Sequence, residues 1–360
     1  MNSYYNILIA FLLLPLLAGA HNDKFKGKYT KEKTLSKEYT VNANAGLEVS
    51  NSYGNIDIVT WNQNRTVIEV RIQTNGNNEE KVQKKLEDID VEFSGNGTLV
   101  KAKTVFDGRK NSSWSWWGNN NNNVKMQIDY TIKLPVGNSV NLSNDYGAIT
   151  IDKLEGNAKI DCDYGQLNIG ELMADDNYLN FDYTKNSTIA YMKSGKINAD
   201  YSEFTLEQVD RLELNADYTD STIEEAKSLN YNNDYGKINV GQVGELVGRG
   251  DYIPLRLETL KGNLNVNTDY GSVHIDRITA EGGDITIDAD YATIKMGFDS
   301  GYSFNFKFDL SYANFKGEDK VTVTQSVKEN HGRKVQGYHG SKSSRNLISI
   351  NSDYGNVSFE

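Results

Sequence analysis

The chain has 360 residues, with 38 Lys and Arg against 49 Asp and Glu, and a formal net charge of −11. This balance excludes the broad basic surface that a phosphate backbone requires, so we expect no nucleic-acid partner. The single cysteine, Cys162, excludes an internal disulfide, and a hydrophobic fraction of 38% is low for two ordinary globular domains. A fold with a narrow core and much exposed surface suits this composition.

Residues 1–20 have the pattern of a signal peptide, because the apolar run Ile7–Leu17 is followed by the small residues Ala18, Gly19 and Ala20. The run is too short to cross a hydrocarbon layer of about 30 Å, and no second apolar stretch approaches that length. We therefore expect an exported protein, in the periplasm or at the cell surface, with no transmembrane segment after signal removal. Residues 21–44 are interpreted as a lead-in to the fold.

Residues 45–140 form an irregular N-terminal part. A first coil is expected around Ser52-Tyr53-Gly54, followed by a strand at 66–73 and a helix at 79–86. A hairpin at 89–105 and a strand at 126–134 complete this part, and they are expected to cover the open end of the later coils. Between them, the Asn-rich loop 107–123 carries Trp114, Trp116 and Trp117, which either fold back over the protein or form a binding loop for sugars or lipid headgroups.

The decisive feature of the sequence is a short repeat. An Asp-Tyr pair recurs every 17 to 21 residues from position 145 to 312, with Ser-Tyr in the same place at 52/53 and 311/312. No globular α/β fold has this signature. The Asp-Tyr pairs lie at 145/146, 163/164, 182/183, 200/201, 217/218, 234/235, 251/252, 269/270, 290/291 and 353/354.

Within each repeat the apolar residues alternate with a period of two, which indicates strands. One such coil has an apolar side and unpaired N–H and C=O groups along both edges. Stacking the next coil about 4.8 Å above satisfies these groups and extends the apolar column. The sequence therefore predicts an all-β, right-handed parallel β-solenoid, or β-helix, of 17–21-residue coils.

The Asp-Tyr-Gly step is interpreted as a corner of the coil. From its phase we expect Tyr to face inward and stack, Gly to permit the bend, and Asp to accept its own backbone N–H two residues on. The alternatives are an outward aromatic stripe that binds glycan, and calcium binding by the aspartates. The corner residues are Asp145, Tyr146, Gly147, Asp163, Tyr164, Gly165, Asp234, Tyr235, Gly236, Asp269, Tyr270 and Gly271.

Residues 45–360 are expected to form a single solenoid domain, with regular coils at 141–316 and a last coil at 347–360. An insertion at 317–346 separates them, and its loop at 328–345 is basic on an otherwise acidic protein. The basic residues of this loop are Lys328, Arg333, Lys334, Lys342 and Arg345.

Over residues 40–360 the order of elements resembles the bacterial putative-adhesin β-helix family, an exported and largely uncharacterised group. The resemblance rests on the leading coil 53–58 with Val59-Thr60-Trp61, the strand Val67–Ile72, the charged helix with Lys84-Lys85-Leu86, the segment 130–137, and the repeated coils. Family members more often have Asn-Gly-Asp at the bend, where this chain has Asp-Tyr-Gly. The resemblance implies adhesion, and it supplies no catalytic residue and no shared ligand.

We therefore expect a non-catalytic, adhesin-like or scaffolding protein of the cell envelope that binds a glycan or a surface protein. No catalytic, cofactor-binding or metal-binding residues are assigned. The main alternative is a β-helix enzyme that degrades polysaccharides, which would need two carboxylates flanking the scissile bond in a cleft built by long loops. A calcium-stabilised binding solenoid is a further alternative. The sequence does not specify an oligomeric state.

Overall fold

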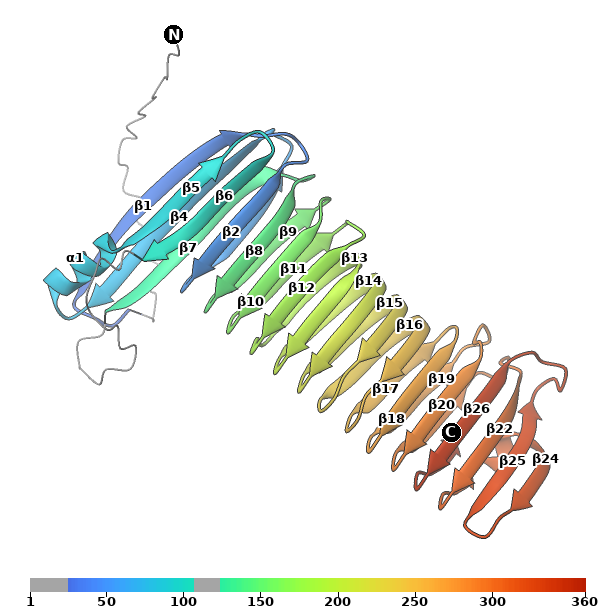
Figure 1. Cartoon of the computed structure of the whole chain (residues 1–360). Helices are drawn as coiled ribbons and strands as arrows, with labels where there is room; N and C mark the ends of the chain where they lie inside the picture. Colours follow the sequence, from blue (N-terminus) through green and yellow to red (C-terminus); the bar gives the residue numbers. More distant parts are fainter. Residues whose placement is uncertain (1–24, 107–123) are drawn as a thin grey trace.

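The computed structural model describes residues 25–106 and 124–360, which form one long rod (Figure 1). In this part of the chain, 27 strands join in one continuous sheet system in which most neighbours along the rod are parallel. The prediction of an all-β, solenoid-like fold is confirmed. The predicted signal peptide and the loop with Trp114, Trp116 and Trp117 lie outside the described residues.

Each regular coil supplies one strand before the Asp-Tyr bend and one after it. In the middle of the rod, the strand after one bend runs without a break into the strand before the following bend. The strands before the bend are β2 (Gly46–Ser52), β8 (Ser139–Asp145), β10 (Ala158–Asp163), β12 (Asn177–Asp182), β18 (Leu264–Asp269), β20 (Ile285–Asp290), β22 (Phe304–Ser311) and β26 (Leu347–Asp353). Those after it are β3 (Ile56–Trp61), β9 (Ala148–Leu154), β11 (Gln166–Leu172), β17 (Pro254–Leu260), β19 (Ser272–Ile278), β21 (Thr293–Phe298), β23 (Phe315–Lys316) and β27 (Val357–Phe359). The continuous strands are β13 (Ser187–Asp200), β14 (Glu203–Asp217), β15 (Asp220–Asn232) and β16 (Lys237–Arg249).

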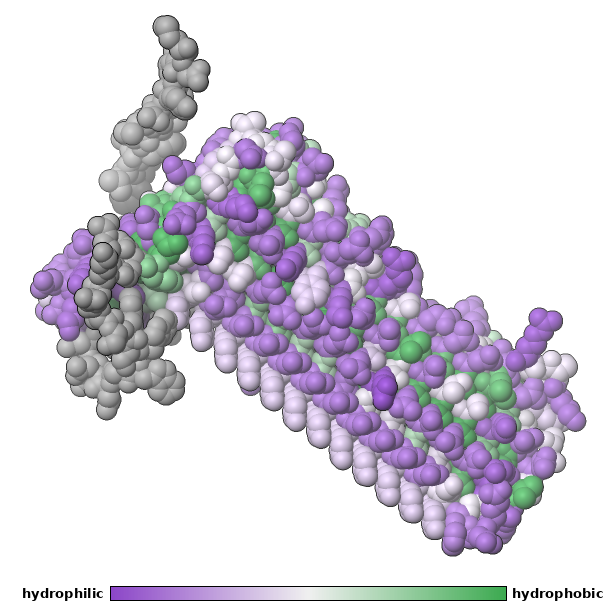
Figure 2. Space-filling model, viewed as in Figure 1, coloured by the Kyte–Doolittle hydropathy of each residue, from purple (hydrophilic) through white to green (hydrophobic). Residues whose placement is uncertain are grey.

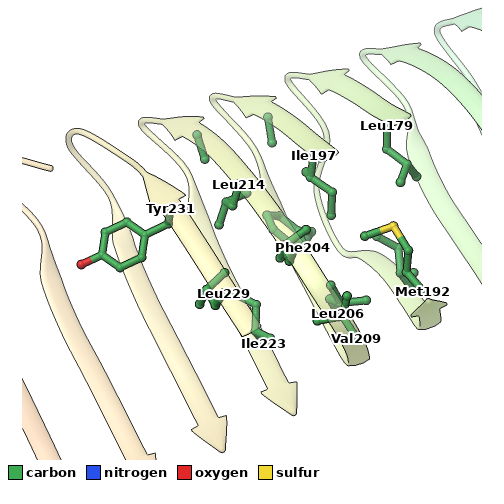
Figure 3. Close-up of a cluster of buried hydrophobic side chains, with 14 of the residues drawn as sticks. Leu179, Met192, Ile197, Phe204, Leu206, Val209, Leu214, Ile223, Leu229 and Tyr231 are labelled. Carbon is green, nitrogen blue, oxygen red and sulfur yellow. The ribbon is translucent and has the colours of Figure 1, made fainter. Parts of the chain in front are cut away.

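Equivalent positions of successive coils pair in register, so they form columns along the rod. Asp163, for example, lies opposite Asp145 on one side and Asp182 on the other. The inward columns are apolar and form one continuous core, in which residues such as Leu214 and Ile223 are fully buried (Figure 3). Burying a side chain of this size contributes about 1.5–3 kcal/mol.

The N-terminal end of the rod is closed by antiparallel strands and one helix. The predicted helix is α1 (Glu79–Glu87), and the predicted hairpin is formed by β5 (Ile89–Gly95) and β6 (Leu99–Phe106), so both are confirmed. The strands expected at 66–73 and 126–134 are β4 (Arg65–Gly76) and β7 (Lys125–Pro135).

The supposed lead-in contains a strand, β1 (Tyr29–Thr40), that sequence analysis missed. It pairs antiparallel with β4 along its whole length. One side of β1 is only partly buried and the other is solvated, so its sequence is mostly polar and carries a weak strand signal. No helix in residues 25–106 or 124–360 has the length and apolar character needed to cross a membrane.

The coils at the C-terminal end do not follow the order of the sequence. Strand β26 lies between β20 and β22 and is parallel to both, although β22 precedes it in the chain (Figure 1). The insertion expected to be a basic loop contains the short 3₁₀ helix η1 (Glu318–Lys320) and a hairpin of β24 (Thr322–Lys328) and β25 (Gly332–His339). Because β25 pairs antiparallel with β22, this hairpin covers the coil that contains β22, which lies at the C-terminal end of the rod.

Candidate functional site: the tyrosine ladder

Twelve tyrosines, one at each bend, form a straight row along one edge of the rod, which we call the tyrosine ladder. The expectation that these rings face inward is wrong, because eleven of the twelve side chains are 45–53% exposed. Figure 2 shows the evenly repeated side chains along this edge. The ladder consists of Tyr53, Tyr146, Tyr164, Tyr183, Tyr201, Tyr218, Tyr235, Tyr252, Tyr270, Tyr291, Tyr354 and Tyr312, in spatial order.

The rings of the ladder stack on one another from coil to coil. Neighbouring ring centroids are 4.7–5.2 Å apart and the ring planes are within 12° of parallel. This spacing matches the separation of adjacent strands, so the backbone sets the stacking distance. Because each ring covers the faces of its neighbours, the ladder presents ring edges and phenolic hydroxyls to solvent.

The inward direction was predicted from the alternation of side chains along the strand. This prediction failed because the bend itself changes the direction of the tyrosine side chain. All twelve ladder tyrosines have a positive φ, between 52° and 68°, which is the left-handed region. The glycines that follow them do not have a positive φ, so the tyrosine and not the glycine makes the turn. A left-handed conformation costs an ordinary residue about 1–2 kcal/mol, and stacking on two neighbours offsets this with about 0.5–1.5 kcal/mol for each pair.

Where a glycine follows the bend, it allows the backbones of two stacked coils to approach each other closely. A Cβ atom on Gly236 would lie 2.1 Å from the carbonyl oxygen of Thr219 in the preceding coil, and one on Gly147 would lie 1.8 Å from that of Gly54. Coils without glycine place Thr184, Ser202, Thr219, Ile253, Ala292 or Ala313 at this position, and all of these except Ala313 are buried. The local path of the chain therefore differs between the two kinds of coil.

The aspartates that precede the ladder form a second line, the aspartate row: Asp145, Asp163, Asp182, Asp200, Asp217, Asp234, Asp251, Asp269, Asp290 and Asp353. Their side chains link neighbouring coils, in contrast to the expected bond within a single turn. The backbone N–H of Asp217, for example, donates to Oδ1 of Asp200 at 3.1 Å, and that of Asp234 donates to Oδ1 of Asp217 at 3.0 Å. In six successive coils, from Asp182 to Asp269, one carboxylate oxygen thus holds the next coil in place.

A third line of side chains, missed by sequence analysis, lies two residues before the aspartates and points outward; we call it the asparagine row. Asn180, Asn198, Asn215 and Asn232 pair in register in four successive coils, and Asn215 Nδ2 donates to Asn198 Oδ1 at 3.1 Å. The recurring Asn-x-Asp-Tyr pattern could have revealed it. The tyrosine ladder, the aspartate row and the asparagine row together form what we call the ridge.

The electrostatics of the ridge follow from its regular spacing. Partial burial, and then the negative charges of neighbouring aspartates, raise the pKa of Asp163 and Asp290. Desolvation, and then the adjacent phenols and aspartates, raise the pKa of Tyr201, Tyr235 and Tyr291. At neutral pH the ridge therefore combines uncharged phenols with a line of mutually repelling carboxylates.

The balance between stacking and backbone strain can be measured at Tyr218. Tyr218→Ala removes two stacking contacts while keeping the left-handed strain, so we expect the free energy of unfolding to fall by about 1–3 kcal/mol. Tyr218→Gly removes the same contacts but relieves the strain, so this variant should be about 1 kcal/mol more stable than the alanine variant. Denaturant titration checks both, with Val247→Ala, at an exposed strand position, expected to change stability by less than about 0.5 kcal/mol. Equal stability of the alanine and glycine variants would show that the left-handed backbone at position 218 is not strained.

Both ends of the ladder are closed by other rings. The imidazole of His331, at the tip of the β24–β25 hairpin, stacks on Tyr312 at 4.9 Å, and Phe106 contacts Tyr53 edge-on at 6.5 Å. The basic residues of this hairpin are partly neutralised, because Arg333 pairs with Glu318 and Lys334 with Glu329. The hairpin therefore extends the ladder and is not a free basic patch.

The other candidates for chemistry do not form a site in the described part of the chain. Across residues 25–106 and 124–360, no three His, Cys, Asp or Glu side chains are grouped so that they could hold a metal ion. Cys162 is buried, and burial raises the pKa of its thiol to about 12, so it is a poor nucleophile.

No protein-family model matches the chain, and no curated protein matches its sequence. Among solved structures, a putative adhesin from Parabacteroides merdae is similar with a TM-score of 0.40 and 12% identity, over 73% of this chain and 95% of that one. A putative adhesin from Parabacteroides distasonis gives 0.36 and 12%, over 73% and 97%, and a putative cell adhesion protein from Clostridium sporogenes gives 0.19 and 11%, over 91% and 99%. These likenesses are too distant to assign a ligand or an activity.

Proposed function

We propose that this protein is an exported, non-catalytic binding protein of the bacterial cell envelope, adhesin-like or scaffolding in role, that binds its ligand along the ridge. In this proposal residues 45–360 act as a single right-handed solenoid of 17–21-residue coils. The observation that carries the proposal is the tyrosine ladder, in which eleven tyrosine side chains are about half exposed in one unbroken line. Tyrosine combines a large contact area with a polar hydroxyl, and an exposed aromatic surface of this extent is typical of an interaction site.

The arrangement of the ridge favours binding over catalysis. A glycoside hydrolase brings two carboxylates together across one bond, and one of them must be able to act as an acid. Here the aspartates repeat once per coil in a straight row, and one oxygen of each of six successive carboxylates, from Asp182 to Asp269, accepts a backbone N–H of the next coil. A periodic row suits a repetitive ligand better than a single reacting bond.

A binding comparison tests this function. The purified protein is applied to an array of bacterial and host glycans and extracellular-matrix proteins, beside a variant with Tyr201, Tyr218, Tyr235 and Tyr252 replaced by asparagine, which tolerates the left-handed conformation. We expect the variant to lose at least about tenfold in affinity for whichever ligand the protein binds, as a loss of about 1.4 kcal/mol implies.

The matched control replaces Thr205, Thr222 and Asn239 by alanine, since these residues lie on the strands after the bend and are partly exposed. The control should bind as the unchanged protein does. Equal binding by the tyrosine variant, or release of sugar from any glycan on the array, would contradict the proposed function.

A further inference from the structure

The first restriction on a ligand of the ridge is that the faces of the tyrosine rings are not accessible. Because each phenol ring is covered on its faces by its neighbours at about 4.9 Å, a sugar ring or a cation cannot lie flat against a tyrosine within the ladder. What remains accessible is one hydroxyl and one ring edge per coil, beside one carboxylate and, in most coils, one amide. A ligand must therefore be recognised by hydrogen bonds and charge.

The second restriction is the repeat distance. An extended peptide advances about 3.3 Å per residue, so side chains on one face recur every ~6.6 Å and fall out of step with the ladder within a few coils. In an extended, equatorially linked chain of pyranose sugars, each unit advances by about the length of one sugar ring, which is close to the coil spacing. Successive sugars of such a chain face opposite ways, so every second sugar presents the same groups, and it does so at every second coil.

The third restriction is charge. The aspartate row holds ten aspartates, and Asp161 and Asp288 stand at asparagine-row positions of two other coils. Within the three rows Arg249 is the sole cation. The whole chain also carries a net charge of −11. A second copy of this protein, a nucleic acid or an acidic glycan would add negative charge beside the aspartate row, whereas a ligand with one positive charge per repeat would neutralise it.

We propose that the ridge binds a single extended polysaccharide chain of amino sugars with free amino groups, lying parallel to the rod with one sugar per coil. In this arrangement the ammonium groups of alternate sugars face the aspartate row, and the hydroxyls of the chain exchange hydrogen bonds with the phenols and the asparagine row. This inference names the ligand class of the proposed function and rests on it. Each contact is exposed and individually weak, so affinity comes from the number of coils engaged.

Oligosaccharides of β-1,4-linked glucosamine are a direct probe, with their fully N-acetylated forms as the uncharged match. We expect affinity, measured by calorimetry, to rise at least about tenfold between a trimer and an octamer and to fall as salt is raised. The acetylated octamer should bind at least about tenfold more weakly, because acetylation removes every positive charge while keeping the length and the hydroxyls.

Two variants locate the contacts. Replacing Asp200, Asp217, Asp234 and Asp251 by asparagine keeps a side-chain oxygen for each backbone N–H of the next coil, so the fold should persist while binding of the octamer and its salt dependence are both reduced. Replacing Tyr201, Tyr218, Tyr235 and Tyr252 by phenylalanine keeps the stacked rings and removes the hydroxyls, and should also weaken binding. Circular dichroism and the unfolding midpoint show whether each variant is folded.

The outcomes separate this inference from the proposed function. Equal affinity for the acetylated octamer, equal affinity for an oligolysine of the same charge, or no effect of the four asparagines would overturn the amino-sugar assignment. If the glucosamine oligomers do not bind while the tyrosine-to-asparagine variant loses another ligand on the array, the proposed function stands and this inference fails. If no ligand depends on the ridge, both fail.

Discussion

Deletion of residues 347–360 is expected to unfold the C-terminal end of the rod while leaving the earlier coils intact. The deletion removes β26 from between β20 and β22, and with it the buried side chains of Ile348, Ile350, Val357 and Phe359. At about 1.5–3 kcal/mol for each side chain, the loss is on the order of 10 kcal/mol, and the edges of both neighbouring strands are left without hydrogen-bond partners. Few local structures survive a loss of this size.

Hydrogen exchange resolves this effect along the chain. The amides of β20, β22 and β25 should lose their protection, whereas those of β10 to β15 should keep it, because each coil of a stacked fold contacts chiefly its neighbours. Deletion of Glu360 alone is the control, since it removes an exposed ion pair with Lys295 and a polar contact with His274 and should cost less than about 1 kcal/mol. Unchanged protection in β22 after the longer deletion would show that β26 does not hold this end together.

Gly236→Ala is the second substitution for which we expect a large effect. The new methyl group would lie 2.1 Å from the carbonyl oxygen of Thr219, and because that atom belongs to the backbone of the preceding coil, the two coils must separate locally. We expect a loss of at least about 3 kcal/mol in the free energy of unfolding, at the upper end of what overpacking usually costs.

The same substitution at Gly97 is the matched control. A Cβ atom there meets only Asn42 Oδ1, at 3.9 Å, so Gly97→Ala should change stability by less than about 0.5 kcal/mol. Denaturant titration of both variants, with circular dichroism to follow strand content, measures the difference. If Gly236→Ala lowers the free energy of unfolding no more than Gly97→Ala does, Gly236 is not needed for the close approach of the two coils.

The fold of this protein was largely predictable because its repeat is explicit in the sequence. Alternation of apolar residues identified the strands, and the spacing of the tyrosines identified the coils, down to the strand on each side of the bend. The helix at 79–87 was recognisable from its charged residues and the two apolar positions that it buries, Val82 and Leu86. The order of the last coils was not predictable, because an identical repeat at 353/354 can pair with any exposed edge.

The direction of the tyrosines was predicted wrongly for a physical reason. Alternation tells which side of a strand a residue faces only while the backbone stays extended, and at Tyr146 and its equivalents φ is positive. The bend therefore rotates the ring out of the core, while the small residue two positions earlier, such as Ala199 or Ala216, fills the corner. A tyrosine followed by glycine reads as a turn in which glycine is left-handed, so the sequence favoured the wrong residue.

The position of β26 also determines when the C-terminal end of the rod can fold. The ribosome makes β22, β24 and β25 before β26, so the coil that contains β22 must wait for a strand that does not yet exist before it can join β20. We therefore expect coils up to β21 to stack first and the final part of the rod to close late. A chain that is stalled or clipped before β26 exposes the open edge of β20, and such an edge is a marker of incompleteness that chaperones and proteases can detect.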